Sequence, residues 1–255
     1  MKFKASGLIR GKGYMPHIFR AGLLVFCLFS VNALWAQNIA LPSKVDLFQY
    51  SASSSGYDLT GKPDARIWGW SRDGKIAYSL ESINSFSGML AGSFIIFDAI
   101  SDEIVVELVK SADDFHSGED LYNNEYMASI SNAIRTHNIV TGQRHDFLPF
   151  PIRKNNMAYD CQISNLVYGN HEYGFFDNRF ISNYDVVIMA NGKRKVIGNY
   201  ASMDVGPGAL YICGYLLSPY EERALVVVAE ESYSFEGESG LRYRLNGCHL
   251  GVGFN

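Results

Sequence analysis

Short strand-like runs recur along most of the chain. They predict an all-β protein, arranged as a β-propeller-like array of about four antiparallel four-stranded meanders. β-Branched and aromatic residues dominate the runs, and turn-forming residues separate one run from the next. Groups of runs start near residues 67, 120, 158 and 209, a spacing of about 40 to 50 residues that matches the length of a propeller blade. The alternative fold for such strands is another β-sandwich or a small β-barrel.

The first 36 residues have the pattern of a signal peptide and are not expected to belong to the fold. Residues 1–20 carry five basic residues and no acidic one, Ala21–Trp35 is uncharged and mostly apolar, and Ala36 is a small residue at the cleavage point. An uncleaved anchor is disfavoured because this apolar run is shorter than the roughly 20 residues that a membrane-spanning helix needs. We therefore predict a bacterial protein that is periplasmic or secreted, cleaved near Ala36, and translated from Met1 or Met15.

Removal of the leader changes the charge of the chain. The sequence has 22 basic and 26 acidic residues, and five of the basic residues lie in the leader, so the mature chain keeps 17 basic residues and a net charge of −9. Nucleic-acid binding relies on clustered Lys and Arg that neutralise phosphates, and an acidic chain does not favour it. We expect no nucleic-acid partner, and no membrane span in the mature chain because no later apolar run is long enough.

The mature chain is expected to start with an N-terminal extension or closing strand at 37–66 and to continue as a propeller-like domain at 67–255. The first meander of that domain is the most distinct, because turn signals at 72–75, 82–92 and 101–103 separate its strands. The four predicted strands are Ile67–Trp70, Ile76–Leu80, Ser93–Phe97 and Ile104–Val109.

The same plan is expected to return later in the chain. One unit has predicted strands at 157–163, 165–171, 184–190 and 194–200, and another has them at 210–217, 223–230, 241–245 and 248–254. Asn191–Gly192 and Asn246–Gly247 are predicted as hairpin turns of the type that needs positive φ. A shorter unit is predicted at 125–150 around Thr141–Gly142, and no amphipathic helix of 12 or more residues is expected.

One strand predicts how the sheets pack. Val226–Val228 is apolar at every position, whereas a strand with one wet face alternates polar and apolar residues. This strand is therefore expected to lie between two neighbouring sheets.

Four segments resemble parts of a known repeat. Trp70–Ser79, which reads WSRDGKIAYS, resembles the core of TolB-type and WD-like β-propeller repeats, with Arg72 in place of a proline. Leu217–Val226 is similar to the same core but departs from its Asp-Gly turn, and Phe97–Asp102 and His137–Gly142 resemble a later strand of these repeats. The resemblance implies a propeller fold and no particular activity, because such propellers serve both as binding scaffolds and as enzymes.

The longer connections are predicted to carry the function. They span 82–92, 110–124, 172–183 and 231–239, on the face opposite the short Gly-containing turns, and they are rich in aromatic residues. The alternative is that these rings fold inward under their own loops. The candidate binding residues are Phe86, Phe115, Tyr173, Phe175, Phe176, Phe180, Tyr233 and Phe235.

Motifs for metals, cofactors and catalysis are lacking in the sequence. The acidic run 113–120 fits no standard calcium loop, and no His or Cys has the spacing of a zinc site. We expect no cofactor and no metal. Three cysteines remain after cleavage: Cys161, Cys213 and Cys248. They are expected to be buried free thiols, and Cys213 and Cys248 are the first pair to test for a disulfide.

Three functions are consistent with these observations. We favour an exported, non-catalytic interaction module of the bacterial cell envelope, which binds a protein or glycan through its acidic and aromatic loop face. One alternative is a small outer-membrane β-barrel, because Gly251–Asn255 resembles a closing strand with a terminal aromatic residue. The other is an envelope hydrolase with paired carboxylates.

Overall fold

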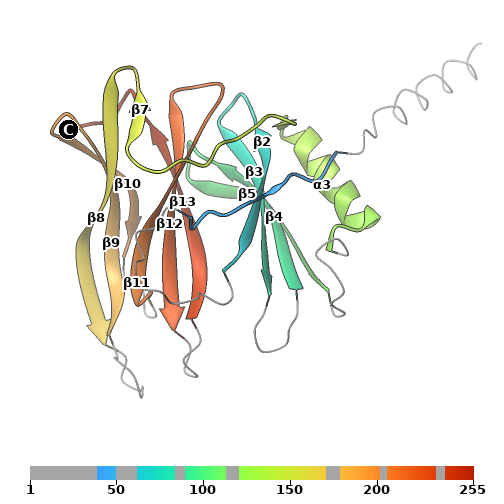
Figure 1. The fold of residues 1–255 in the computed structure, drawn as a ribbon, viewed down its shortest axis with the longest axis horizontal. Coiled ribbons are helices and arrows are strands. Elements are labelled where there is room, and N and C mark those ends of the chain that lie inside the picture. The colour runs from blue at the N-terminus through green and yellow to red at the C-terminus, as the bar shows by residue number, and fades with distance from the viewer. Residues whose placement is uncertain are drawn as a thin grey trace, which may run out of the picture. The chain divides into compact units, whose positions relative to one another are not determined.

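The computed structural model describes residues 39–49, 62–83, 90–112, 121–170, 179–201, 206–233 and 239–255. Contacts within the chain separate Met1–Ile39 from Ala40–Asn255, and every described helix and strand belongs to the second unit. That unit is mostly β-structure, with three antiparallel sheets and one helix among the described residues (Figure 1).

The first sheet, sheet A, contains the predicted first meander. Its strand order is β1-β2-β3-β4-β5, and β6 pairs with β2. A side chain at Gly69 would overlap the carbonyl oxygen of Val140, so the close approach of β6 requires a glycine there. The strands are β1 (Lys44–Val45), β2 (Asp64–Trp70), β3 (Lys75–Ile83), β4 (Leu90–Asp98), β5 (Glu103–Ala112) and β6 (Val140–Thr141).

The second sheet, sheet B, has three strands in the order β11-β12-β13. They are β11 (Ala209–Leu217), β12 (Arg223–Tyr233) and β13 (Ser239–His249). The predicted hairpin turn at Asn246–Gly247 is wrong, because β13 runs through both residues in unbroken register with β12. Neither residue has positive φ, and Asn246 is buried. Pairing with the long strand β12 therefore overrides the local turn preference.

The third sheet, sheet C, has the order β10-β9-β8-β7. The predicted turn at Asn191–Gly192 is confirmed, and both residues have positive φ. The two strands expected at 157–163 and 165–171 are one strand, whose register shifts between Ser164 and Val167. Asn165 adopts positive φ at that shift, so the turn-forming residue produces a bulge instead of a break. The strands are β7 (Ile152–Lys154), β8 (Met157–Asn170), β9 (Arg179–Ala190) and β10 (Lys193–Tyr200).

A helix occupies part of the segment that was predicted as a shorter meander. Helix α3 (Asn124–Thr136) has 13 residues, so the expectation of no such helix is wrong. The side chain of Asn123 caps it by accepting a hydrogen bond from the Tyr126 amide at 3.0 Å. Its buried residues include Tyr126, Ile130 and Ala133, which lie on one helical face. The Tyr126 hydroxyl donates to the Leu108 carbonyl oxygen of β5, so this face covers sheet A (Figure 1).

Sheet B lies between sheets A and C. Leu225, Val227 and Ala229 of β12 belong to a core cluster shared with sheet A, and Val226 and Val228 belong to a second cluster shared with sheet C. The prediction that this apolar strand lies between two sheets is confirmed. The described residues therefore form three packed sheets, and a helix and the short strand β6 occupy the segment 125–150, where one of the four meanders was expected.

Short turns gather at one end of this array. The Arg223 guanidinium, after the β11–β12 turn, donates to the carbonyl oxygen of Ala99 in the β4–β5 turn at 2.9 Å. Lys195, after the β9–β10 turn, donates to the carbonyl oxygen of His249 at 2.9 Å. Because the strands are antiparallel, β3, β5, β8 and β12 all end at the opposite end. Within the described ranges, no helix is both long enough and apolar enough to cross a membrane.

Candidate functional site: a cleft beside strand β13

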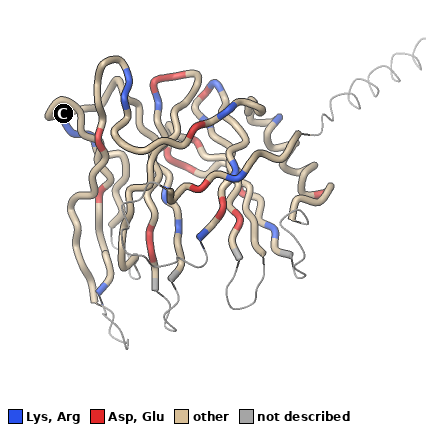
Figure 2. Tube along the Cα trace, viewed as in Figure 1, with Lys and Arg blue, Asp and Glu red and all other residues tan. Residues whose placement is uncertain are grey.

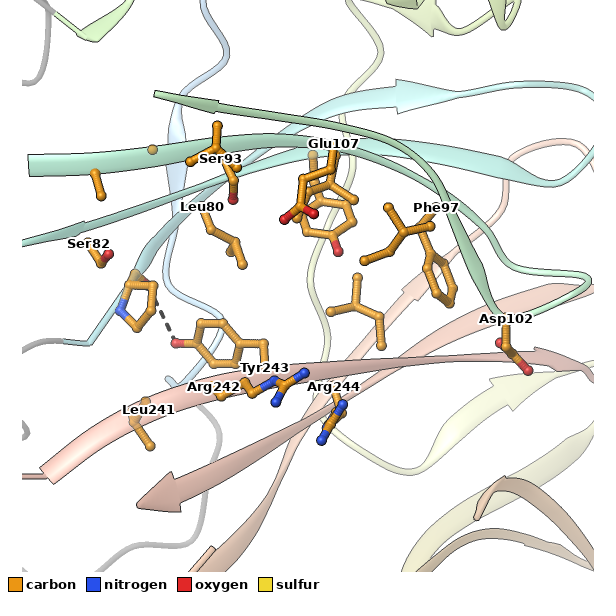
Figure 3. Close-up of a pocket in the computed structure, with 18 of the residues that line it drawn as sticks. Leu80, Ser82, Ser93, Phe97, Asp102, Glu107, Leu241, Arg242, Tyr243 and Arg244 are labelled. Atoms are coloured by element: carbon orange, nitrogen blue, oxygen red, sulfur yellow. Dashed lines mark hydrogen bonds between the residues drawn. The ribbon is translucent and has the colours of Figure 1, made fainter. Parts of the chain in front are cut away.

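An open cleft lies between sheet A and strand β13. Its volume is about 570 Å³, and β3, β4 and β5 supply one wall while β13 supplies the other (Figure 3). Sheet A is wider than sheet B, and β13 is an edge strand that pairs only with β12 in the part of the chain that the structure describes. The cleft therefore lies where a fourth strand of sheet B would be.

The sheet A wall is an apolar surface with one acidic residue. Ile104 and Val109 of β5 line the cleft and are 54% and 69% exposed. Their cross-strand neighbours on β4 include Phe97, which is buried against sheet B. The side chains of sheet A on this face thus become exposed at β5, beyond the part of the face that sheet B covers. Glu107 lies on the same face of β5, and Figure 3 shows its carboxylate projecting into the cleft.

The backbone of β13 directs hydrogen-bonding groups toward this cleft. In an antiparallel sheet, alternate residues of an edge strand point their N–H and C=O away from the neighbouring strand. The Gly247 N–H donates to Asp102 Oδ1 at 2.6 Å, so Gly247 belongs to the outward-pointing set. The unbroken register with β12 places Leu241, Tyr243 and Leu245 in the same set. All three line the cleft.

Side chains of β13 alternate between the two neighbouring sheets. Leu241, Tyr243 and Leu245 pack against the core shared with sheet A. The Tyr243 hydroxyl donates to the carbonyl oxygen of Pro63 at 3.5 Å (Figure 3), and burial raises the pKa of Tyr243 well above its usual range. Arg242 and Arg244 occupy the interleaved positions, on the face toward sheet C.

Arg244 is held in place by a buried polar cluster between sheets B and C. Its Nε lies 2.9 Å from Glu230 Oε1, and its guanidinium lies 4.9 Å from the centre of the Tyr200 ring. Tyr184 stacks on Tyr200 with ring centres 4.7 Å apart and donates a 2.7 Å hydrogen bond to Glu230 Oε1. Burial raises the pKa of Tyr200 to about 12, so this ring stays neutral at physiological pH. The cluster fixes one arginine beside the cleft.

Arg242 differs from Arg244 because it is exposed. No ion pair joins its guanidinium to a carboxylate among the described residues. The two arginines are two positions apart on a strand and therefore share a face. Together they place positive charge along one side of the β13 edge.

Other buried carboxylates have structural partners. Glu81 forms an ion pair with Arg66 and accepts a 2.8 Å hydrogen bond from the Tyr122 hydroxyl. Asp185 accepts hydrogen bonds from the side-chain amides of Asn165 and Asn199. These contacts tie strands together within sheets A and C. Among the described residues, no group of three His, Cys, Asp or Glu could hold a metal ion.

Most of the aromatic residues predicted as a binding face lie outside the described residues. These are Phe86, Phe115, Tyr173, Phe175, Phe176 and Phe235, together with the side chain of Tyr233. Phe180 is described and is only 8% exposed, in strand β9. A side chain at Gly169 would overlap its ring, which lies across the neighbouring strand. Phe180 therefore packs inward, as in the alternative that the sequence left open. The acidic run 113–120 also lies outside the described residues.

The three described cysteines are free, and two of them lie on opposite faces of sheet B. Cys213 belongs to the core shared with sheet A, and Cys248 belongs to the core shared with sheet C. The suggested pairing of these two thiols is therefore wrong. Burial raises the pKa of Cys213 to about 12 and that of Cys248 to about 11, so both stay protonated at neutral pH.

The residues of the cleft were not identified from the sequence. The spacing of Arg242 and Arg244 was available as a signal, because residues two apart on a strand share a face. The predicted strand 241–245 contains both arginines, but the predicted turn at Asn246–Gly247 placed a further strand at 248–254 beside it, so no open edge was expected there. Val109 is an ordinary strand residue in the sequence, and its exposure depends on the missing neighbour strand.

Comparisons of the chain with protein-family models, with curated proteins and with solved structures find no match. The resemblance to TolB-type and WD-like repeats therefore stays a prediction, and the function is argued from the cleft itself.

Proposed function

We propose that this protein is an exported, non-catalytic binding module of the bacterial cell envelope that captures an extended polypeptide segment along β13. The captured segment would become the fourth strand of sheet B, within an open, propeller-like array of sheets. The observation that carries the proposal is the edge of β13, which has no second neighbouring strand among the described residues and lies beside a cleft with an exposed apolar wall. Export rests on the leader pattern of residues 1–36.

Strand addition suits the groups that this cleft presents. Main-chain groups of Leu241, Tyr243 and Leu245 supply hydrogen-bond donors and acceptors, and main-chain pairing gives affinity without requiring a particular sequence. Ile104 and Val109 supply apolar surface that becomes buried when a strand covers it. An edge with these properties is a template for pairing with another chain.

The test uses a displayed library of random peptides of about twelve residues, enough to pair along the whole of the 11-residue strand β13. Binders are selected on the purified protein and then measured with two variants. Val109→Arg places a long side chain in the cleft, whereas Val105→Arg makes the same change on the same strand at an exposed residue that does not line the cleft. We expect Val109→Arg to weaken selected peptides at least about tenfold and Val105→Arg to leave them unchanged.

Hydrogen exchange supplies a second measurement at the backbone. In the free protein, the amides of Tyr243 and Leu245 should exchange faster than those of Arg242 and Arg244, which face β12. A bound peptide should protect the Tyr243 and Leu245 amides. If the selection yields no binder, or if binders ignore Val109→Arg and leave these amides unprotected, strand capture at β13 is refuted.

Export is tested separately in a bacterial host. Expression of the full sequence should give a mature protein in the periplasm or medium whose first residue, read by mass spectrometry, lies near Gln37. Retention of the leader in a cytoplasmic product would contradict the proposal on export and leave the binding test unaffected.

A further inference from the structure

The two sides of the β13 edge differ in chemistry, and a strand added there would present one row of side chains to each. In an antiparallel pair, residues directly opposite each other have side chains on the same face. Residues of the added strand opposite Leu241, Tyr243 and Leu245 would therefore face the sheet A wall. The residues between them would lie beside Arg242 and Arg244.

The inner row, that is, the side chains of the added strand that would face the sheet A wall, meets a surface that favours apolar side chains. Val109 and Ile104 are exposed there, and Leu80 lines the same wall. Glu107 lies between Ile104 and Val109 on β5, so an acidic side chain in this row would meet a like charge in a partly enclosed space. The wall thus accepts apolar residues and disfavours acidic ones.

The outer row, that is, the side chains of the added strand that would point to the opposite face, lies beside two arginines. Arg242 is exposed and without a carboxylate partner in the described ranges, so a carboxylate opposite it gains an ion pair without displacing one. Glu230 contacts Arg244 at Nε, and a guanidinium has further N–H donors for a second carboxylate. The contact with Glu230 and the Tyr200 ring also reduces the freedom that Arg244 loses on binding.

We infer that the segment captured at β13 alternates apolar and acidic side chains, with its acidic residues directed toward Arg242 and Arg244. This rests on the proposed strand capture and adds the side-chain pattern of the partner. The attraction is local. The chain as a whole has a net charge of −4, and Figure 2 shows basic and acidic residues interspersed over the sheets. Because exposed charges are screened beyond about 10 Å at 0.1 M salt, the two arginines act on the segment that lies against them.

The test uses three capped synthetic peptides of about nine residues, long enough to pair along 241–245, since the Gly247 amide already donates to Asp102. All have valine and threonine at the inner positions, and they differ only in having glutamate, glutamine or lysine at the outer positions. Two cross-strand charge pairs add to the affinity of the glutamate peptide, so we expect it to bind about tenfold more tightly than the glutamine peptide. The lysine peptide should bind most weakly, and added salt should reduce the differences.

A charge reversal assigns the preference to β13. Arg242→Glu should abolish or reverse the preference for glutamate, because Arg242 is exposed and its replacement disturbs no described ion pair. Arg194→Glu is the matched control, an exposed arginine at the start of β10 outside the cleft, and it should change nothing. Equal binding of the three peptides, with no effect of Arg242→Glu, would overturn the alternating pattern and leave strand capture standing. If none of the peptides binds and the library also yields no binder, both proposals fail.

Discussion

Replacing Glu230 by alanine removes a carboxylate that two side chains contact between sheets B and C. Glu230 is buried on β12, forms an ion pair with Arg244 at 2.9 Å and accepts a 2.7 Å hydrogen bond from the Tyr184 hydroxyl. Its loss leaves a guanidinium and a phenol without that partner. Stability should therefore fall because both groups keep the cost of leaving water and lose the contact that offsets it.

The size of this effect follows from the exposure of the partners. Breaking a fully buried ion pair costs about 3–5 kcal/mol. The Arg244 side chain is 24% exposed, so water compensates part of its lost charge partner. We expect Glu230→Ala to lower the free energy of unfolding by about 2–4 kcal/mol. Glu230→Gln keeps an acceptor for the Tyr184 hydroxyl and should cost less, about 1–2 kcal/mol.

Urea unfolding followed by tryptophan fluorescence measures these values, because Trp68 and Trp70 are buried in the same unit. Glu103→Ala is the control, since Glu103 is exposed and has no ion pair among the described residues, and it should change stability by less than about 0.5 kcal/mol. A Glu230→Ala variant no less stable than Glu103→Ala would refute the assignment of this cluster as a structural contact between the sheets. It would also remove the argument that Arg244 is held in place beside the cleft.

Three further predictions concern titration and turn geometry. Asp102 has positive φ and its carboxylate accepts the Gly247 amide, so Asp102→Ala should lower stability by about 1–2 kcal/mol in urea unfolding. Asp102→Asn keeps an oxygen that accepts from Gly247, and asparagine tolerates positive φ. Burial raises the pKa of Asp102, which means that the site disfavours the charged carboxylate, so the neutral asparagine should be no less stable than the wild type at pH 7. A loss of stability equal to that of Asp102→Ala would contradict this account. Burial lowers the pKa of His145, so as the pH falls below 6.5 the unfolded chain takes up a proton before the folded chain does, and the free energy of unfolding should drop between pH 6.5 and the lower folded-state pKa. His145→Gln should flatten this part of the plot of stability against pH. An unchanged plot would exclude His145 as the cause of the drop. Burial raises the pKa of Cys213 and Cys248, so these two thiols should react with a thiol reagent only after unfolding, and rapid labelling of either thiol in the native protein would contradict its burial.

Local signals in the sequence were reliable where one strand and one turn decide the structure. The turn at 72–75 and the Asn191–Gly192 hairpin are formed as predicted, because glycine and asparagine accept the backbone angles that these tight turns need. The apolar run in β12 indicated burial on both faces, since each of its alternate rows lies in a different core.

Local signals failed where pairing with a distant strand was stronger. Asn246–Gly247 has the composition of a turn, but β12 supplies eleven positions to pair with β13, and the strand continues through it. Asn165 bends β8 without ending it, because β9 continues on the other side of the bulge. Helix α3 was missed because its face is only partly apolar, and its burial depends on the outer face of sheet A.

By itself the sequence determined the β-rich character of the chain, the apolar strand between two sheets and the tight turns at 72–75 and 191–192, because each depends on residues close together along the chain. It also determined the prediction of a leader, which follows from charge and hydropathy alone. Only the tertiary structure decided that, among the described residues, sheet B has three strands beside a wider sheet A, so that β13 has an open edge in this part of the chain. The cleft arises from that difference in sheet width, and it is lined by both Val109 of β5 and Arg242 of β13, residues separated by more than half of the chain.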